Sequence, residues 1–494
     1  MKRLLVLLAA VLLAGCTAAS ESVPTDSAAT VPVQEKPAQM YESRFSSETL
    51  IELSDEGIKT KALSAFTTND IIYYEDRDFY ESGNPYGEGT DADKHSAEEA
   101  AAHTVVNITK PGAYRVTGKL SAGQIRVDLG EHAYDDPNAV VELILDDADI
   151  TCTVAPAILF LNVYECDGNW DENTAKHDVD TSKAGANLIL EGENTVNGSY
   201  VARIYKDKDG EKKLWKQDGA IYSYMSMNIF GPGALELSAE NEGIDTELHL
   251  TIHGGDLTVR SGNDGINTNE DKVSVTTING GNIRIVAGLG AEGDGIDSNG
   301  YLVINGGTVV SAAHPASDAG LDSDCGSYIN GGTVVALGST MDWAESESDQ
   351  VTMNLQFADY RDANDKITVT KEDGSEAFSF DPATDAVMAE SARAFMGAII
   401  SCPDLKQGES YLIFVGGEQM RYTGTDVRRH HGGRGEIPEE GKFPEHIDGQ
   451  QPADMDLPIG FGGPIPTRQD GEGNTLFFMQ DKVNNFSGLS AVTE

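Results

Sequence analysis

Four copies of a short acidic motif carry the side chains in this sequence that are best suited to binding a metal ion. They read Glu-Gly-Ile-Asp at 242–245, Asp-Gly-Ile-Asn at 264–267, Asp-Gly-Ile-Asp at 294–297 and Ala-Gly-Leu-Asp at 319–322, with an imperfect earlier copy, Asp-Gly-Ala-Ile, at 218–221. We expect the Ile or Leu of each copy to point inward and the flanking acids to point outward. Between residues 240 and 324 the chain has 14 acidic residues and only three basic ones, so this outward face is strongly negative.

Carboxylates that stack at strand spacing repel one another, and a bound cation is the simplest way to offset that repulsion. Calcium accepts six to eight oxygen ligands in flexible geometry, so carboxylates from neighbouring repeats can converge on one ion. The alternative is that these residues cap turns and face solvent, where salt screens them. The candidate calcium ligands are Asp245, Asp264, Asn267, Asp294, Asp297, Asp322 and Asp324.

A second repeated element predicts how these motifs are positioned. The segments Ile-His-Gly-Gly at 252–255 and Ile-Asn-Gly-Gly at 278–281, 304–307 and 329–332 follow one another at intervals of 26, 26 and 25 residues. A short strand with period-2 alternation follows each turn, and no helical pattern separates the strands. This spacing predicts stacked coils of a parallel β-solenoid, with Asn279, Asn305 and Asn330 forming a structural asparagine ladder.

The ordered succession of these motifs resembles a bacterial family of cell-surface carbohydrate-binding β-helix proteins, which are similar in fold to pectate-type polysaccharide lyases. The resemblance rests on Gly-Asp-Gly-Ile-Asp-Ser-Asn-Gly at 293–300, Ile-Asn-Gly-Gly-Thr-Val at 304–309, and further matches at 112–128, 143–150 and 190–198. It implies an all-β fold, a right-handed parallel β-helix with a small C-terminal β cap. It also implies bound calcium on the acidic face and affinity for plant cell-wall polysaccharide, notably polygalacturonate (the backbone of pectin) and cellulose. Two departures are Ala319, which replaces a leading acid, and an inserted, lysine-rich segment at 171–217.

The ends of the chain predict export and anchoring. Lys2 and Arg3 precede an apolar run at 4–14, and Gly15 and Cys16 follow it. This segment resembles a lipoprotein signal, in which the cysteine becomes acylated. We therefore expect the protein on the extracellular face of the cell membrane, held there only by lipid. The predicted segments are a signal peptide at 1–16, a flexible tether at 17–45, the β-helix at 46–350, a C-terminal β region at 351–424, a disordered Gly/Pro/His-rich segment at 425–472 and a terminal strand at 473–494.

The composition of the chain narrows the range of possible functions. With 81 acidic and 35 basic residues the net charge is −46, which argues against binding to nucleic acid. Three functions remain open: a non-catalytic polysaccharide binder, which we favour; a lyase acting on uronate polymers, with Arg284 as the best candidate base; and a calcium-rigidified surface adhesin. The pairing of Cys152, Cys166, Cys325 and Cys402 and the oligomeric state also remain open.

Overall fold

The computed structural model describes residues 41–74, 94–205, 214–339, 341–391, 393–422, 467–469 and 474–492. The predicted signal peptide with Cys16, the tether up to residue 40 and nearly all of the segment at 425–472 lie outside these residues, so those predictions stay untested. Within the described residues the helical elements are α1 (Ala97–Ala101) and two short 3-10 helices, Ala133–Asp135 and Met388–Glu390. The all-β prediction is confirmed, and no helix in the described part of the chain is long and apolar enough to span a membrane.

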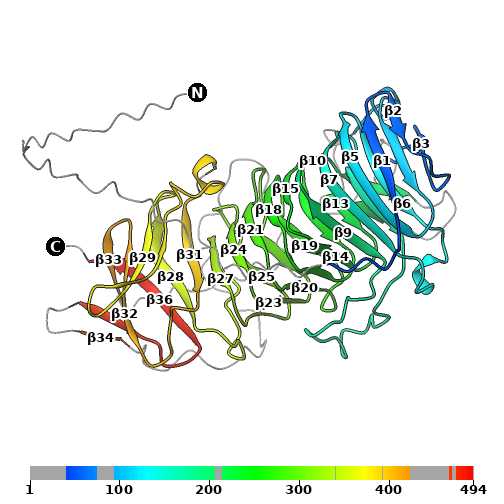
Figure 1. Ribbon diagram of the computed structural model, residues 1–494. Coiled ribbons are helices and arrows are strands. Elements are labelled where there is room, and N and C mark those ends of the chain that lie inside the picture. The colour runs from blue at the N-terminus through cyan, green and yellow to red at the C-terminus, as the bar shows by residue number, and fades with distance from the viewer. Residues whose placement is uncertain are drawn as a thin grey trace, which may run out of the picture.

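Most strands belong to three ladders in which successive repeats pair in parallel (Figure 1). The first ladder carries the acidic motifs. Its strands are β4 (Thr104–Ile108), β6 (Gly123–Asp128), β8 (Ile158–Asn162), β13 (Gly219–Ser223), β16 (Glu242–Thr246), β19 (Ile266–Thr268), β22 (Ile296–Ser298) and β25 (Asp322–Ser323), and β3 (Ala65–Thr68) pairs antiparallel with β4.

The other two ladders alternate with the first along the chain. The second comprises β9 (Ala186–Glu191), β14 (Met227–Phe230), β17 (Leu250–Ile252), β20 (Val275–Ile278), β23 (Tyr301–Ile304) and β26 (Gly326–Ile329). The third comprises β1 (Glu48–Ser54), β5 (Gly112–Leu120), β10 (Glu193–Gly198), β15 (Ala234–Ala239), β18 (Asp256–Ser261), β21 (Asn282–Val286), β24 (Thr308–Ala312) and β27 (Thr333–Gly338), and β2 (Gly57–Lys59) pairs antiparallel with β1. The long strand β7 (Val141–Cys152) contributes to both ladders.

The inward side chains of all three ladders form one core. Ile244, Ile266 and Ile296 of the first ladder are fully buried in it, together with equivalent aliphatic residues of the other two. Because each repeat supplies an inward aliphatic residue at the same register position, every new repeat buries the open end of the one before it. The stacking of residues about two dozen positions apart is therefore confirmed. The handedness and closure that a right-handed parallel β-helix also requires remain predictions.

The turns follow the sequence expectation. The second glycine of each Ile-x-Gly-Gly segment has a positive φ, and a Cβ at Gly307 would lie 2.6 Å from the carbonyl oxygen of Gly281. Only glycine fits such a corner without strain. The asparagine ladder is also present: the Asn305 amide donates to Asn279 Oδ1 and the Asn330 amide to Asn305 Oδ1, both at 2.9 Å.

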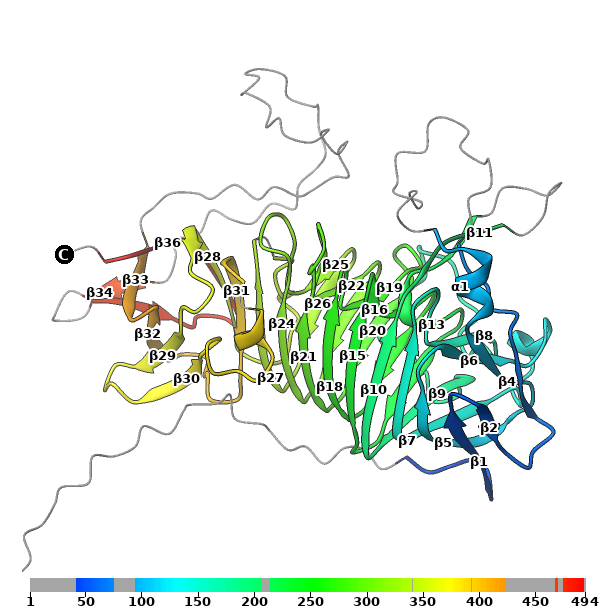
Figure 2. The ribbon, with the colours of Figure 1, turned by 90° about the horizontal axis from the view of Figure 1, so that it is seen from above.

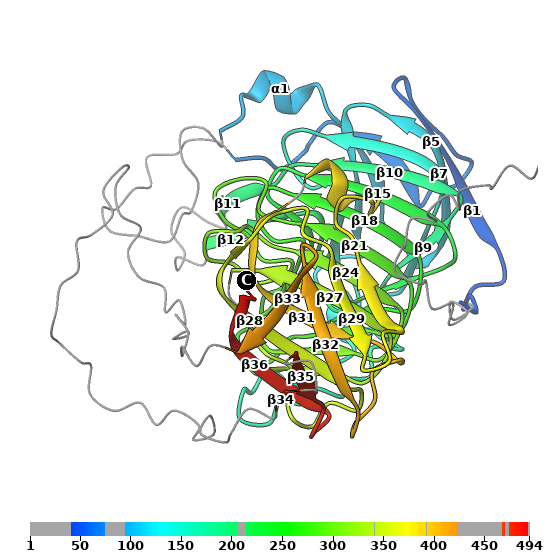
Figure 3. The same ribbon diagram turned by 90° about the vertical axis from the view of Figure 1, so that its left-hand side faces the viewer.

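The C-terminal strands lie at one end of the stack, with the first strands of the chain at the other (Figures 1 and 3). They are β28 (Thr352–Arg361), β29 (Ile367–Lys371), β30 (Glu376–Phe380), β31 (Phe395–Ser401), β32 (Ser410–Val415), β33 (Glu418–Tyr422), β34 (Thr467–Gln469), β35 (Thr475–Phe478) and β36 (Val483–Ala491). The outward side chains Val286, Val310 and Val335 of the third ladder share a second core with these strands. A hairpin of β11 (Val201–Tyr205) and β12 (Leu214–Gln217) projects beside the first ladder (Figure 2).

Candidate cation-binding site

The first ladder brings most of the predicted ligands into two neighbouring columns. Asp245 is the register partner of Asn267, Asn267 of Asp297, and Asp297 of Asp322, so these four residues form one column. The same register places the leading acids Glu242, Asp264 and Asp294 in the adjacent column, where Ala319 takes the last place. The columns run along the outward side of strands whose isoleucines point into the core.

Three carboxylates at the N-terminal end of these columns form a compact cluster. Oxygen atoms of Asp218, Glu242 and Asp245 all lie within 4.8 Å of one another, and all three side chains are buried. Among the described residues, no other group of three His, Cys, Asp or Glu side chains meets this criterion. We call Asp218, Glu242 and Asp245 the carboxylate cluster.

One ammonium group contacts the carboxylate cluster. Lys216 on β12 places Nζ 2.5 Å from Asp218 Oδ2, although half of the lysine side chain is exposed. Partial burial opposes the charged form of Lys216, but the negative charges of Asp218, Glu242 and Asp245 outweigh it and raise the lysine pKa. Lys216 therefore stays protonated and acts as a tethered counter-ion to Asp218.

Several oxygens of this site lack partners. Asn269 donates to Asp245 Oδ1 at 2.7 Å, yet Asp245 Oδ2 accepts no hydrogen bond from any described residue. Glu242 Oε2 and Asn267 Oδ1 are buried and equally unpartnered in the described part of the chain. Buried polar atoms nearly always have partners, because leaving one unpaired costs about 1–3 kcal/mol. Three such oxygens on adjacent repeats match the ligand chemistry of a hard cation.

The ionised forms of the cluster carboxylates are unfavourable when no cation offsets their charges. Burial, followed by the charge of Asp218, raises the pKa of Glu242 to about 8. Burial and then the charge of Glu242 raise the pKa of Asp245 well above its ordinary range. Both effects disfavour the ionised form, so the cluster holds protons at neutral pH unless a cation replaces them.

The remaining predicted ligands differ in their surroundings. Asp264 accepts the Asp294 amide at 2.7 Å, and Asp294 accepts the Ala319 amide at 2.5 Å, so both carboxylates also stabilise the turns of their columns. Burial raises the pKa of Asp322 to about 7, and the charge of Asp342 adds to the effect. Asp324 is the last of the predicted ligands. It lies beyond the end of β25 with an exposed side chain, outside the two columns.

Sequence reasoning left three members of the site out of its ligand set. Asp218 and Glu242 belong to copies of the acidic motif, so the motif itself was a usable signal for both. Lys216 had no such signal, because it reaches the cluster through the hairpin of β11 and β12. Its four lysine neighbours in the sequence, at 206, 208, 212 and 213, lie outside the described residues.

Arg284, the candidate base for a lyase, forms an ion pair. Arg284 projects outward as predicted, but its Nε donates to Asp385 Oδ2 at 3.0 Å, and the two side chains are only 12% and 6% exposed. This ion pair attaches the loop before Met388–Glu390 to the third ladder. Arg260 bridges Glu236 and Glu390 on the same face, so it is also engaged in ion pairs. Both arginines therefore connect the stack to the C-terminal region.

The described cysteines form no disulfide bonds with one another. Cys152, Cys166, Cys325 and Cys402 are all free thiols. Burial raises the pKa of the Cys152 thiol to about 12, which makes it unreactive.

Comparison with known proteins gives three findings. Residues 102–403, more than half of the chain, match a family model described as carbohydrate-binding domain-containing protein. A protein of that description from Acetivibrio thermocellus is 31% identical over 176 residues, which are 35% of this chain; the chain spans about half (51%) of that relative. A solved structure described as a polysaccharide lyase-like protein from C. thermocellum, in a gadolinium derivative, aligns at 23% identity and a TM-score of 0.33, over 58% of this chain and 93% of its own.

Proposed function

Because the chain belongs to the family of carbohydrate-binding domain-containing proteins, we propose that it binds an acidic extracellular polysaccharide without cleaving it, through calcium held by the carboxylate cluster. The observation that carries this proposal is the set of three unpartnered, buried oxygens on Glu242, Asp245 and Asn267. Glu242 and Asp245 lie on one repeat and Asn267 on the next, on the same side of the stack. The chemistry of this donor set fits a hard cation.

The charge of the site supports a divalent ion. When Asp218, Glu242, Asp245 and Lys216 are all ionised, three negative charges and one positive charge leave a net charge of −2. One calcium ion neutralises that charge, whereas a monovalent ion leaves half of it. Asp218, Glu242, Asp245 and the Asn267 carbonyl would hold the ion, which when bound attracts the carboxylates of an anionic sugar. The chain's own role is to present these oxygens in a fixed column.

Several finer features belong to the same proposal. We infer that the repeats form a right-handed parallel β-helix, which the parallel register of all three ladders supports. We also infer that Cys16 is acylated after export and holds the protein on the extracellular face of the membrane. A site for extracellular glycan and millimolar calcium requires that location.

The proposal is tested by measuring binding to polygalacturonate in affinity gels, with calcium and with a chelator. The wild-type protein is expected to be retarded only with calcium. Glu242→Gln, which keeps the size of the side chain but removes its charge, is expected to lose most of this retardation. Asp324→Asn is the matched control, because it removes an exposed acid that lies two residues beyond the last motif, outside the columns. Equal retardation with and without calcium contradicts the proposal, and release of unsaturated uronate products assigns the chain to the lyases instead.

A further inference from the structure

The first five residues that the structure describes, 41–45, lie against the outward side of the second ladder. Figure 1 shows this start of the described chain, in blue, beside β9 and β14. Its rings, Tyr41 and Phe45, pack on a small apolar cluster that is separate from the main core and consists of Ala113, Ile144, Ile189 and Phe230. We call residues 41–45 the clamp.

The clamp covers side chains that would otherwise face solvent. On β7, Leu143 and Leu145 point into the main core, so Glu142 and Ile144, which alternate with them, point outward. Even so, Glu142 is 0% exposed and Ile144 only 5%. Outward side chains of a strand are buried only where another segment covers them, and here that segment is the clamp.

The carboxylate of Glu142 receives its hydrogen bonds from the clamp. The Tyr41 hydroxyl donates to Oε1 at 2.7 Å, and the Ser43 hydroxyl donates to Oε2 at 2.5 Å. The backbone N–H of Arg44 also donates to Oε1, at 2.8 Å. Hydrogen bonds to an ionised acceptor are roughly twice as strong as those between neutral groups. The clamp therefore replaces the water that burial removes from this carboxylate.

Aromatic stacking adds an apolar contact to these hydrogen bonds. The ring centroid of Tyr41 lies 4.5 Å from that of Phe230, and Phe230 stacks in turn on His253 at 4.4 Å. Burial, followed by the hydrogen bond to Glu142, raises the pKa of Tyr41, so its hydroxyl remains a donor at neutral pH. Polar and apolar contacts thus hold the same tyrosine in place.

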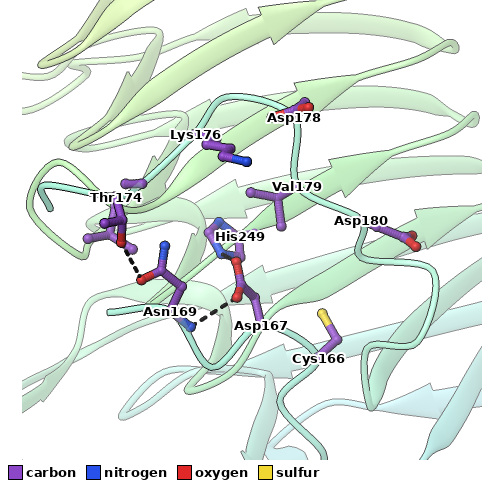
Figure 4. Close-up of a pocket in the computed structure, with 11 residues that line it drawn as sticks. Cys166, Asp167, Asn169, Thr174, Lys176, Asp178, Val179, Asp180 and His249 are labelled. Carbon is purple, nitrogen blue, oxygen red and sulfur yellow. Dashed lines mark hydrogen bonds and ion pairs between the residues drawn. The ribbon is translucent and has the colours of Figure 1, made fainter. Parts of the chain in front are cut away.

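A second segment covers the same face farther along the stack. Residues 166–180 fold over a polar pocket of about 330 Å³ (Figure 4). Directly after them, the buried Thr181 hydroxyl contacts Asn228 Oδ1 at 2.7 Å. The guanidinium of Arg44 donates to the carbonyl oxygen of Ser182, which joins the clamp to this second segment. The clamp is therefore bound both to the ladder and to the segment beside it.

The clamp fixes the face at which the N-terminal part of the chain leaves the stack. Figure 3 shows β9 of the second ladder on one side of the stack and the hairpin of β11 and β12, which lies beside the first ladder, on the other. The acidic columns belong to the first ladder. A membrane attached through residues before the clamp therefore lies nearer to the second ladder than to the acidic columns.

We propose that the clamp is an orienting device, which holds the second ladder towards the membrane and presents the acidic columns on the side away from it. The inference rests on the membrane attachment in the proposed function, but not on its calcium site. Anionic headgroups would repel the acidic columns, so the orientation also keeps like charges apart. A flexible tether as long as residues 17–40 spans roughly 25–30 Å on average, so the face that it leaves stays nearest to the lipid.

The first test is hydrogen exchange of the Arg44 amide, which donates to Glu142 in the docked clamp. We expect this amide to be protected in the wild-type protein. The double variant Tyr41→Ala, Ser43→Ala removes the other two donors, and the protection should fall at least about tenfold, the equivalent of one lost hydrogen bond to a charged group. Glu42→Ala is the matched control, because it changes an exposed side chain of the clamp and should leave the protection unchanged.

The second test measures orientation by energy transfer to an acceptor dye in the membrane. A histidine tag replaces residues 1–16, and the protein is bound to phosphatidylcholine vesicles that contain a nickel-chelating lipid, so acylation is not needed. The donor dye is placed, through a non-natural side chain, either at Lys183 beside the clamp or at Phe66. Phe66 is 46% exposed, and its register column continues through the first ladder to Asp245.

We expect more transfer from position 183 than from position 66, and a smaller difference in the double variant. The inference is overturned if the Arg44 amide exchanges as fast in the wild type as in the double variant. It is also overturned if the two positions of the wild type transfer equally. The double variant alters only the clamp, so its retardation by polygalacturonate should equal that of the wild type. If both tests succeed but Cys16 carries no acyl chain in the native protein, only the anchoring in the proposed function is refuted.

Discussion

The stability of the calcium-free protein should fall as the pH rises, and Glu242 provides the clearest case. The folded protein keeps a proton on this carboxyl up to about pH 8, whereas the unfolded chain releases it near the ordinary value of 4.5. Because the folded state binds more protons over that interval, the free energy of unfolding decreases with pH there. The contribution is fully present below 4.5 and is lost as the pH rises through about 8.

The size of the effect follows from the same interval. Each pH unit over which only the folded state holds the proton is worth about 1.4 kcal/mol, so the interval from 4.5 to about 8 corresponds to about 5 kcal/mol. Glu242→Gln removes the titrating group but keeps an amide of similar shape. In chelator at about pH 8 the variant should therefore be more stable than the wild type, by up to about 5 kcal/mol, and the difference should vanish towards about pH 4.

The assay is urea unfolding followed by far-ultraviolet circular dichroism, at several pH values, with chelator and with calcium. The difference between the wild type and Glu242→Gln is the relevant quantity. The charge of Glu242 also raises the pKa values of Asp245 and Asp264, so the variant relieves those two carboxyls as well, and their contribution has the same sign. If the cluster binds calcium as proposed, calcium should reverse the order of stability at about pH 8, since the ionised wild-type cluster would hold the ion more tightly than the variant. A wild-type protein that equals or exceeds the variant in chelator at about pH 8 would refute the account of this cluster.

Three further predictions concern the scaffold, each measured by chemical or thermal unfolding. Asp385→Ala leaves the guanidinium of Arg284 buried without its partner and should cost about 3–5 kcal/mol in urea; an unchanged midpoint would show that the pair does not hold the loop. Asn305→Ala removes the side-chain hydrogen bonds that join Asn305 to Asn279 and to Asn330, and it should lower the free energy of unfolding by about 1–3 kcal/mol. An unchanged free energy of unfolding would show that the asparagine ladder does not stabilise the fold. Gly307→Ala should lower the thermal midpoint more than Gly374→Ala, because both glycines have a φ of 84° but only Gly307 has a close backbone neighbour.

The repeat architecture was predictable because its signals are local. The Ile-x-Gly-Gly turns mark each corner, and the aliphatic residue of each acidic motif must face the core, so the interval between copies sets the register of the strands. Asp245, Asn267, Asp297 and Asp322 consequently lie in one column, as the sequence indicates. Asp324 follows the end of the last strand of the ladder, so its role as a ligand stays a prediction.

The residues that escaped prediction depend on contacts between distant segments. The position of Lys216 depends on a hairpin with no counterpart in the other repeats, and Arg284 is paired with a residue 101 positions away. His249 becomes part of a pocket only because the segment at 166–180 folds over it. Periodicity describes what every repeat shares, so it carries no information about additions that occur once.

Lys216 offers a final distinction between a binding protein and a lyase. A base that removes a proton must first be uncharged, and the surrounding carboxylates raise the pKa of Lys216 and keep it protonated. In a binding protein the ammonium instead competes with calcium for the oxygens of Asp218. Two charges about 4 Å apart near a protein surface interact by up to about 4 kcal/mol, and the half-exposed lysine should contribute about a third of that.

Lys216→Met keeps the length of the side chain and removes its charge, so it should tighten calcium binding about tenfold in calorimetry and leave the retardation by polygalacturonate intact. If Lys216 is a catalytic base, the wild-type protein releases unsaturated uronate products and the variant does not. Weaker calcium binding by Lys216→Met would contradict the counter-ion role, because removing a competing positive charge cannot reduce the attraction of the cluster for a cation unless the lysine also shapes the site. Lys216→Arg, which restores the positive charge, should bring calcium affinity back towards that of the wild type and so separates charge from shape.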